Sequence, residues 1–163
     1  MSISIRSAGP ADAGIVFGFV RALAEYEKLS HEVEADEAMI AAALAGPNPR
    51  VFCDIAEWNG APAGFALWFY NFSTFRGRHG IYLEDLFVDP ALRGHGIGKA
   101  LLVHLARRCV DEGLGRLEWA VLDWNAPSIA FYRAQGAVLM DEWTGCRVSG
   151  EALARLAGET AAA

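Results

Sequence analysis

Two periodicities of apolar residues alternate along the chain and separate strands from helices. Ile3 to Arg6 alternates between apolar and polar residues, as a half-buried strand does, and the segment from Pro10 to Tyr26 places apolar residues at helical spacing. Glu34 to Ala45 has the same helical character and ends at the "GPNP" stretch. These patterns predict a strand followed by two helices.

The dipeptide Asn59-Gly60 separates two further apolar runs, Val51 to Trp58 and Ala63 to Phe72. Asn-Gly between such runs is the strongest short-range signal of a β-hairpin, because both residues accept the positive φ that a type I′ turn requires. The sequence therefore predicts two antiparallel strands joined at this dipeptide.

The second half of the chain continues the alternation of strands and helices. We expect strands over Ile81–Val88, Leu117–Leu122, Ala137–Glu142 and Cys146–Ser149, and helices over Gly98–Glu112, from Pro127 to near Gly136, and over Glu151–Ala157. No repeat or linker interrupts the series. The order predicts one α/β (α+β) domain over residues 1–163, with a mixed sheet covered by helices on both faces.

Composition and charge narrow the class of protein. Hydrophobic residues make up 53% of the chain, but no run approaches the roughly 18 apolar residues of a membrane span. The first ten residues lack the pattern of a secretory signal, and the three cysteines are widely spaced, so we expect a cytoplasmic protein without a membrane partner. A net charge of -6 disfavours nucleic acid and suits a cationic small molecule.

Glu84 and Asp85 stand together in a strand that is otherwise apolar on both sides. Successive strand residues point to opposite faces, which predicts one face with Tyr82, Glu84, Leu86 and Val88 and another with Ile81, Leu83, Asp85 and Phe87. A bulge in the strand would change which face each acid takes. An unpaired carboxylate in such a strand is costly or has a raised pKa. One acid can pair with an arginine such as Arg93 or lie at a hydrated strand end. Alternatively, the acids form a base or a cation site.

The segment "RGHGIGK" follows that strand and places Gly94, Gly96 and Gly98 at the start of a helix. Backbone N–H groups at a helix start favour an anion such as a pyrophosphate, and glycine lets that anion approach closely. An ordinary glycine-rich turn is the alternative. The nucleotide-triphosphatase and dinucleotide-binding loops do not fit, since Arg93, Lys99 and Ala100 occupy positions that those patterns reserve for other residues.

The succession of "YLEDLFV", "RGHGIG" and "WNAPSIAFYRAQGA" resembles the GCN5-related N-acetyltransferases (GNAT) over nearly the whole chain. The resemblance implies the GNAT acyl-CoA N-acyltransferase fold, with a mixed, mostly antiparallel sheet, and acetyl-CoA as co-substrate. "ALAEYEKL" and "GEALARLAG" look like the diamine (spermidine/spermine) acetyltransferase branch. "NFSTFRGR" and "AVLDWN" are similar to its thialysine N-epsilon-acetyltransferase members.

The same resemblance implies roles for particular positions. On the donor side, backbone groups of Phe87 and Val88 would bind the pantetheine arm, and Asn125 and Ser128 would contact it. The pyrophosphate would be held by Arg93 and the amides of Gly94, His95, Gly96, Ile97, Gly98 and Lys99. Tyr132 would face the thioester sulfur as the catalytic acid. On the acceptor side Glu84 matches the general base, while Tyr26, Glu27 and Asp85 match residues that bind the amine.

The chain departs from the diamine branch in two places. Lys99 replaces a serine in the pyrophosphate loop, which adds a charge. Phe75 stands roughly where the branch has a tryptophan, and Arg76, Arg78 and His79 make the acceptor loop basic. A basic loop disfavours a polyamine, and Arg76 or Arg78 can pair with a substrate carboxylate. We therefore predict a small-molecule primary amine, a thialysine- or lysine-like amino acid or a diamine, as the acceptor, ahead of a polyamine.

The chemistry follows from the pKa of the acceptor. An alkyl ammonium has a pKa of about 10.4 and must lose a proton before it attacks a thioester. We expect Glu84 to take that proton and Tyr132 to protonate the thiolate, by direct transfer in a ternary complex. The histidines lack metal-ligand spacing and no cysteine has a neighbouring histidine, so neither a metal nor an acyl-enzyme is expected.

Other readings of the chain stay open. They are a polyamine acetyltransferase, a protein or peptide N-acetyltransferase, and a non-catalytic acyl-CoA-binding regulator. We expect a homodimer, because the scaffold that the chain resembles commonly dimerises and apolar surface near the carboxyl-terminal strands is available for it.

Overall fold

The computed structural model describes residues 1–159, and its contacts divide the chain into two compact units. The first unit spans Met1–Ala126 and contains the whole sheet. The second begins at Pro127. No helix formed by residues 1–159 is long and apolar enough to cross a membrane.

The first unit follows the predicted order of strands and helices. Its elements are β1 (Ile3–Ser7), α1 (Ala13–Tyr26), α2 (Glu37–Leu44), β2 (Phe52–Trp58), β3 (Ala61–Ser73), β4 (Arg78–Val88), α3 (Ile97–Asp111) and β5 (Leu117–Glu118), with single 3-10 turns at Pro10–Asp12, Ser30–Glu32 and Pro90–Leu92. Local signals set several of the boundaries: Asp36 caps α2 by accepting a hydrogen bond from the Met39 amide at 2.8 Å.

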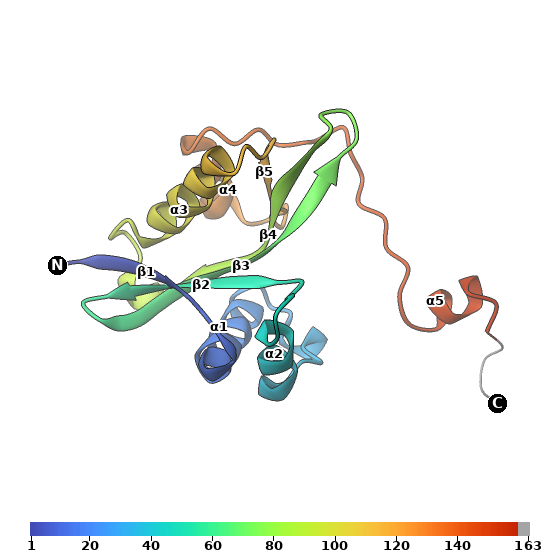
Figure 1. Cartoon of the computed structure of the whole chain (residues 1–163), viewed down its shortest axis with the longest axis horizontal. Helices are drawn as coiled ribbons and strands as arrows, with labels where there is room; N and C mark the ends of the chain where they lie inside the picture. The colour runs from blue at the N-terminus through green and yellow to red at the C-terminus, as the bar shows by residue number, and fades with distance from the viewer. Residues whose placement is uncertain (160–163) are drawn as a thin grey trace. The chain divides into compact units, whose positions relative to one another are not determined.

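The sheet has the order β1-β2-β3-β4-β5, antiparallel throughout except for the parallel β4–β5 pair. Asn59 and Gly60 join β2 to β3 with φ angles of 51° and 83°, which confirms the predicted hairpin. Helices α1 and α2 cover one face of the sheet and α3 covers the other (Figure 1). The prediction of a mixed, mostly antiparallel sheet between helices is confirmed.

Each face of the sheet has its own buried layer. On the α1 side, Val16 and Leu44 pack with Ile55, Phe65 and Phe87 from three adjacent strands. On the α3 side, Trp68 is buried beneath Arg108, whose guanidinium carbon lies 5.1 Å from the ring centre. The apolar stripe predicted on α3 is buried as expected at Leu101, Leu102, Leu105 and Cys109.

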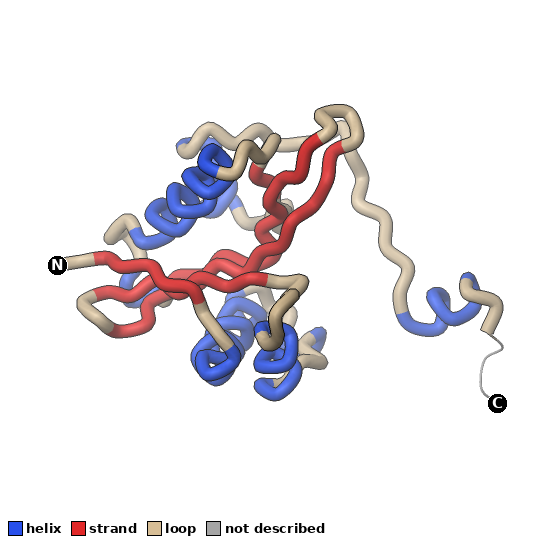
Figure 2. Tube along the Cα trace, viewed as in Figure 1, coloured by secondary structure: helices blue, strands red, loops and turns tan. Residues whose placement is uncertain are grey.

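The carboxyl-terminal part corrects the sequence-based prediction. Helices form at Ala126–Ala134 (α4) and Gly150–Leu156 (α5), close to the expected places, but the segment between them is loop, as Figure 2 shows. The strands predicted over Ala137–Glu142 and Cys146–Ser149 are therefore wrong for this structure. Val138 and Trp143 are 80% and 77% exposed, so the apolar pattern there has no packing partner among the described residues. The strand predicted to reach Leu122 also ends at Glu118.

Candidate active site

A β-bulge in β4 decides where the two adjacent acids point. Leu67 of β3 pairs with Asp85 and the next residue, Trp68, pairs with Leu83, so Glu84 is an extra residue without an opposite partner. Paired residues share a face, which places Asp85 with Leu67 on the α1 side and Leu83 with Trp68 on the α3 side. The predicted common face for Leu83 and Asp85 is therefore wrong, because simple alternation ignores the extra residue.

Asp85 is half-buried among carboxylates. Burial, followed by the charges of Glu84 and Glu27, raises its pKa to about 6. Burial also raises the pKa of Glu27, which directly follows α1. No ion pair within residues 1–159 joins Arg93 to Glu84 or Asp85, so the structure does not support the predicted alternative of an arginine partner. An unneutralised acid cluster is an environment that attracts a cation.

The end of α1 contributes further negative potential near Glu27. The helix terminates in a Schellman arrangement, in which the Leu29 amide donates to the Ala24 carbonyl and the Lys28 amide donates to the Glu25 carbonyl. Lys28 has a φ of 61°, at the position where glycine is usual. Carbonyl groups at a helix carboxyl terminus carry partial negative charge, which favours an ammonium group.

The edge of β4 beside β5 is open over most of its length. β5 pairs only with Ile81 and Tyr82, so among residues 1–159 the β4 segment from Leu83 to Val88 has no ladder partner on that side. The Asp89 amide donates to Ala63 on the β3 side, and peptide groups alternate, so those of Val88 point to the open edge and those of Phe87 point to β3. Leu86 presents its peptide groups in the same direction as Val88, a feature that the sequence analysis missed.

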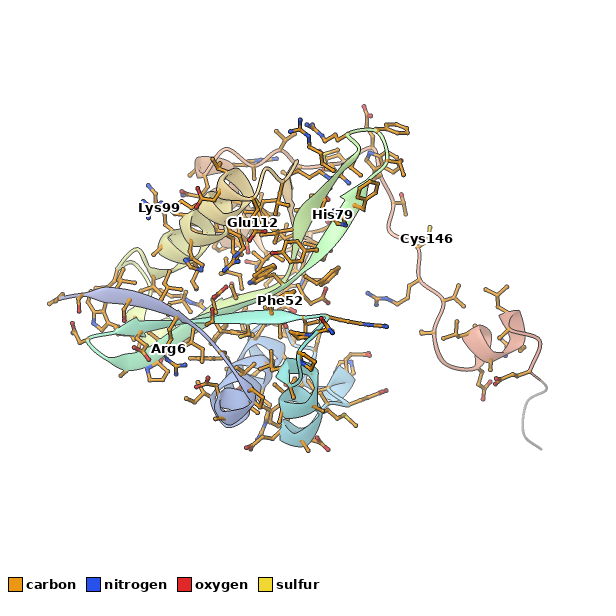
Figure 3. The ribbon with its side chains drawn as sticks, viewed as in Figure 1. Arg6, Phe52, His79, Lys99, Glu112 and Cys146 are labelled. Carbon is orange, nitrogen blue, oxygen red and sulfur yellow. The ribbon has the colours of Figure 1, made fainter. Side chains whose placement is uncertain are left out.

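The glycine-rich segment forms the corner between β4 and α3. Gly94 and Gly96 have φ angles of 83° and 82°, a conformation that side-chain-bearing residues rarely adopt, and no atom lies within 4 Å of a Cβ built on either. Ile97 is buried and anchors the first turn of α3. The exposed amides before it have the space and charge that a pyrophosphate needs. Lys99 extends from α3 near this corner (Figure 3).

Tyr26 and Arg93 connect the end of α1 with the corner between β4 and α3. The Tyr26 hydroxyl donates to Oδ1 of the buried Asn125 at 3.1 Å, and the Arg93 guanidinium lies 4.6 Å from the Tyr26 ring centre. Trp124 lies 6.2 Å from the same ring, with the Lys28 ammonium 5.4 Å from the indole. The sequence predicts roles for Tyr26, Arg93 and Asn125, but it gives no signal for Lys28 or Trp124, which come together only through folding.

The remaining predicted residues lie farther along the chain. Phe75, Arg76 and Arg78 are exposed on the hairpin that joins β3 to β4, where Figure 3 also labels His79. Ser128 and Tyr132 are one turn apart on α4, so they share a face of that helix within the second unit.

Comparisons with known proteins find a family model and several similar proteins. The model of the "Acetyltransferase (GNAT) family" matches residues 18–137. A thialysine N-epsilon-acetyltransferase of Bos taurus is 39% identical over 168 residues, covering 96% of this chain and 98% of that protein. An L-ornithine N5-acetyltransferase of Arabidopsis thaliana is 45% identical over 91 residues, which cover 56% of this chain and 40% of that protein. A solved integron cassette protein of V. cholerae superposes with a TM-score of 0.79 at 28% identity, covering 96% and 98% of the two chains.

Proposed function

We propose a substrate and a mechanism for this chain, which belongs to the acetyltransferase (GNAT) family and is an acetyl-CoA-dependent N-acetyltransferase. The enzyme acetylates the side-chain primary amine of a small, lysine-like amino acid. The observation that carries the proposal is the cluster of Glu27, Glu84 and Asp85, in which burial and mutual repulsion raise the pKa of Asp85 to about 6. Such a cluster has unsatisfied affinity for an ammonium group.

The donor lies along the open edge of β4 and across the glycine corner. Val88 and Leu86 offer peptide groups to the pantetheine arm, in place of the missing β5 neighbour. The amides from Gly94 to Lys99 hold the pyrophosphate, as the open space at Gly94 and Gly96 allows. Asn125 and Ser128 complete the contacts with the arm.

The reaction forms a C–N bond and breaks the thioester C–S bond. Glu84, exposed at the bulge, takes one proton from the ammonium and so frees the nitrogen lone pair for attack. Tyr132 donates its phenolic proton to the departing thiolate, whose pKa resembles the 8.5 of a cysteine. Orientation of the amine and the carbonyl supplies most of the acceleration, roughly 7 to 11 kcal/mol.

The cysteines support direct transfer over an acyl-enzyme route. Burial raises the pKa of the Cys53 thiol to about 12, and burial also raises that of Cys109. A buried thiol with a raised pKa supplies almost no thiolate at neutral pH and is a poor nucleophile. Attack by the amine in a ternary complex therefore needs no acetylated cysteine.

The names of the thialysine and L-ornithine acetyltransferases among the relatives agree with an amino-acid acceptor. Thialysine and L-ornithine both carry a terminal primary amine and an α-carboxylate, and the basic hairpin with Arg76 and Arg78 is suited to pair with that carboxylate. A polyamine is the second candidate, because three clustered acids also suit a substrate with several positive charges.

A thiol-release assay tests these proposals. With acetyl-CoA, the enzyme is expected to show higher kcat/KM for thialysine or L-ornithine than for spermidine or an amino-terminal peptide. Tyr132→Phe and Glu84→Gln should lower kcat by about 100-fold or more. Glu151→Gln, an exposed acid on α5, serves as the matched control. Preference for spermidine would favour the polyamine reading, preference for the peptide would favour a protein acetyltransferase, and binding of acetyl-CoA without turnover of any amine would favour a regulator.

We also propose that the enzyme acts as a homodimer. Apolar side chains are exposed throughout the second unit, at Val138, Met140, Trp143, Val148, Leu153 and Leu156. So dense a set of exposed apolar residues is typical of a contact surface. Sedimentation equilibrium should give twice the chain mass, and Trp143→Glu should shift it towards the monomer.

A further inference from the structure

Arg93 makes contacts that belong to both substrate sites. Its Nε donates to the Val88 carbonyl at 3.2 Å, and its guanidinium lies over two aromatic rings, 4.6 Å from the centre of Tyr26 and 5.6 Å from that of Phe87. The side chain therefore spans from the open edge of β4 to the end of α1. One residue further along the chain, Gly94 begins the corner where the pyrophosphate is proposed to bind.

The two groups that Arg93 contacts have their own tasks in the proposed function. The Val88 carbonyl points to the open β4 edge, where the pantetheine arm would pair. Tyr26 directly precedes Glu27, a member of the acid cluster, and its hydroxyl already bonds to Asn125. The Arg93 guanidinium covers the ring of Tyr26, a side chain that matches the acceptor side of the family, and its positive charge disfavours an ammonium group at that ring.

From these contacts we propose that Arg93 is a positioning residue that couples the donor site to the acceptor site through Tyr26. Without donor, Arg93 covers Tyr26 and bonds to Val88. When the donor is bound, the pyrophosphate attracts the guanidinium, which releases the Val88 carbonyl to the pantetheine arm and uncovers Tyr26 beside the acids. The inference rests on the proposed function, because it assumes a pyrophosphate at the glycine corner and an amine at the acid cluster.

If Arg93 couples the two sites, each substrate changes the Kd of the other. Removing a residue that only binds one substrate would not change that dependence. If the donor removes a contact that hinders the amine, the donor tightens amine binding, and by linkage the amine tightens donor binding by the same factor. We expect a factor of at least about 5, the lower end of typical couplings, because one exposed cation–π contact and one hydrogen bond are exchanged. Removing Arg93 should abolish the coupling by improving amine binding in the absence of donor.

Isothermal titration calorimetry with thialysine measures the coupling directly, using coenzyme A so that no turnover occurs. In the unmodified enzyme, saturating coenzyme A should lower the thialysine Kd by about 5-fold or more. In Arg93→Ala, thialysine should bind without coenzyme A about as tightly as it binds the unmodified enzyme with coenzyme A. Arg107→Ala, which removes an exposed arginine of α3, should keep the full coupling.

Two substitutions of Tyr26 separate the ring from the hydroxyl. Tyr26→Phe keeps the aromatic face under Arg93 and loses only the bond to Asn125, so the coupling should persist. Tyr26→Leu removes the aromatic face, so the coupling should fall towards 1. Circular dichroism and the thermal midpoint confirm that each variant is folded before the titrations are interpreted.

The outcomes distinguish this inference from the proposed function. If coenzyme A and thialysine both bind the unmodified enzyme but neither alters the other's Kd by more than about 1.5-fold, the coupling is refuted while the function stands. Retention of the coupling in Arg93→Ala also refutes it. If coenzyme A does not bind at all, the donor site itself is refuted, and the coupling with it.

Discussion

Asp54 on β2 and Asp85 on β4 lie on opposite faces of one sheet and have opposite surroundings. Asp54 is only 2% exposed and receives hydrogen bonds from Trp68 Nε1 at 2.8 Å and Ser7 Oγ at 3.3 Å, with His104 Nε2 at 3.5 Å. Asp85 has Glu27 and Glu84 as its electrostatic neighbours. A carboxylate that accepts hydrogen bonds from several strands stabilises their packing. A carboxylate surrounded by other negative charges is destabilised unless a cation binds beside it.

The difference separates an acid held by hydrogen-bond donors from the acid that we propose binds the substrate amine. The hydrogen bonds of Asp54 join β1, β2 and β3, and His104 of α3 lies near it on the face of the sheet away from α1. The acids near Asp85 come from β4 and from the end of α1, and both Asp85 and Glu27 have raised pKa values. Perturbed pKa values of this kind are common at sites that bind or activate substrates.

The largest expected effect concerns Asp54, the acid held by hydrogen-bond donors. Asp54→Ala leaves the buried Trp68 indole N–H without its acceptor, and an unsatisfied buried donor costs about 1 to 3 kcal/mol. We expect urea unfolding to show a loss of about 3 kcal/mol. Glu57→Ala removes a partly exposed acid of the same strand and should cost less; an equal loss in the two variants would contradict the assigned role of Asp54.

Asp85→Asn is expected to act in the opposite direction. Because the folded-state pKa of Asp85 is raised to about 6 from 3.8, its contribution to stability is fully present below pH 3.8 and is lost as the pH rises through 6. The neutral amide escapes that loss, so the variant should be more stable by up to about 3 kcal/mol at pH 8 and by only about 0.5 kcal/mol at pH 4. Thermal unfolding at the two pH values checks this.

In the same variant, the affinity for the substrate amine should change in the opposite direction from the stability of the fold. Asp85→Asn should weaken thialysine binding although it stabilises the fold. A variant that is both more stable and a better binder at pH 8 would contradict the assignment of Asp85 to the amine site.

A smaller effect is expected from the pH alone. Thialysine keeps its ammonium charge between pH 7.5 and 5, whereas Asp85 gains a proton below about pH 6. The Kd of thialysine, measured by calorimetry, should therefore rise about 5-fold as the pH falls through this range, because the cluster loses one of the charges that attract the ammonium group. In Asp85→Asn the dependence should flatten, and a profile unchanged by that substitution would assign the titration to another group.

The smallest expected effect concerns backbone strain at the end of α1. Lys28 adopts a φ of 61° where glycine is usual, so Lys28→Gly should raise stability by up to about 1 kcal/mol, measured by urea unfolding. The gain is limited because the ammonium also lies 5.4 Å from the Trp124 ring. Lys28→Ala, which keeps the strain and loses the charge, is the control and should be less stable than the glycine variant.

Much of the fold was predictable because its signals are local. The Asn59-Gly60 hairpin, the apolar stripe of α3 and the glycine corner all depend on residues within a few positions of one another. The predicted strands at 137–142 and 146–149 fail for the opposite reason. A strand exists only when another strand pairs with it, and apolar alternation cannot show whether a partner edge is available.

The features of the candidate site also separate into those that local sequence determines and those that depend on tertiary contacts. By itself, the sequence determined which chemical groups are present: a pair of acids in a strand, a glycine-rich corner before a helix, and Tyr26 at the end of a helix. Only the tertiary structure decided their relationships. The register against β3 created the bulge at Glu84, and packing of α1 brought Glu27 to Asp85 and Tyr26 to Arg93. Charges and rings interact through space over a few ångströms, so their energies depend on distances that the order of residues does not contain.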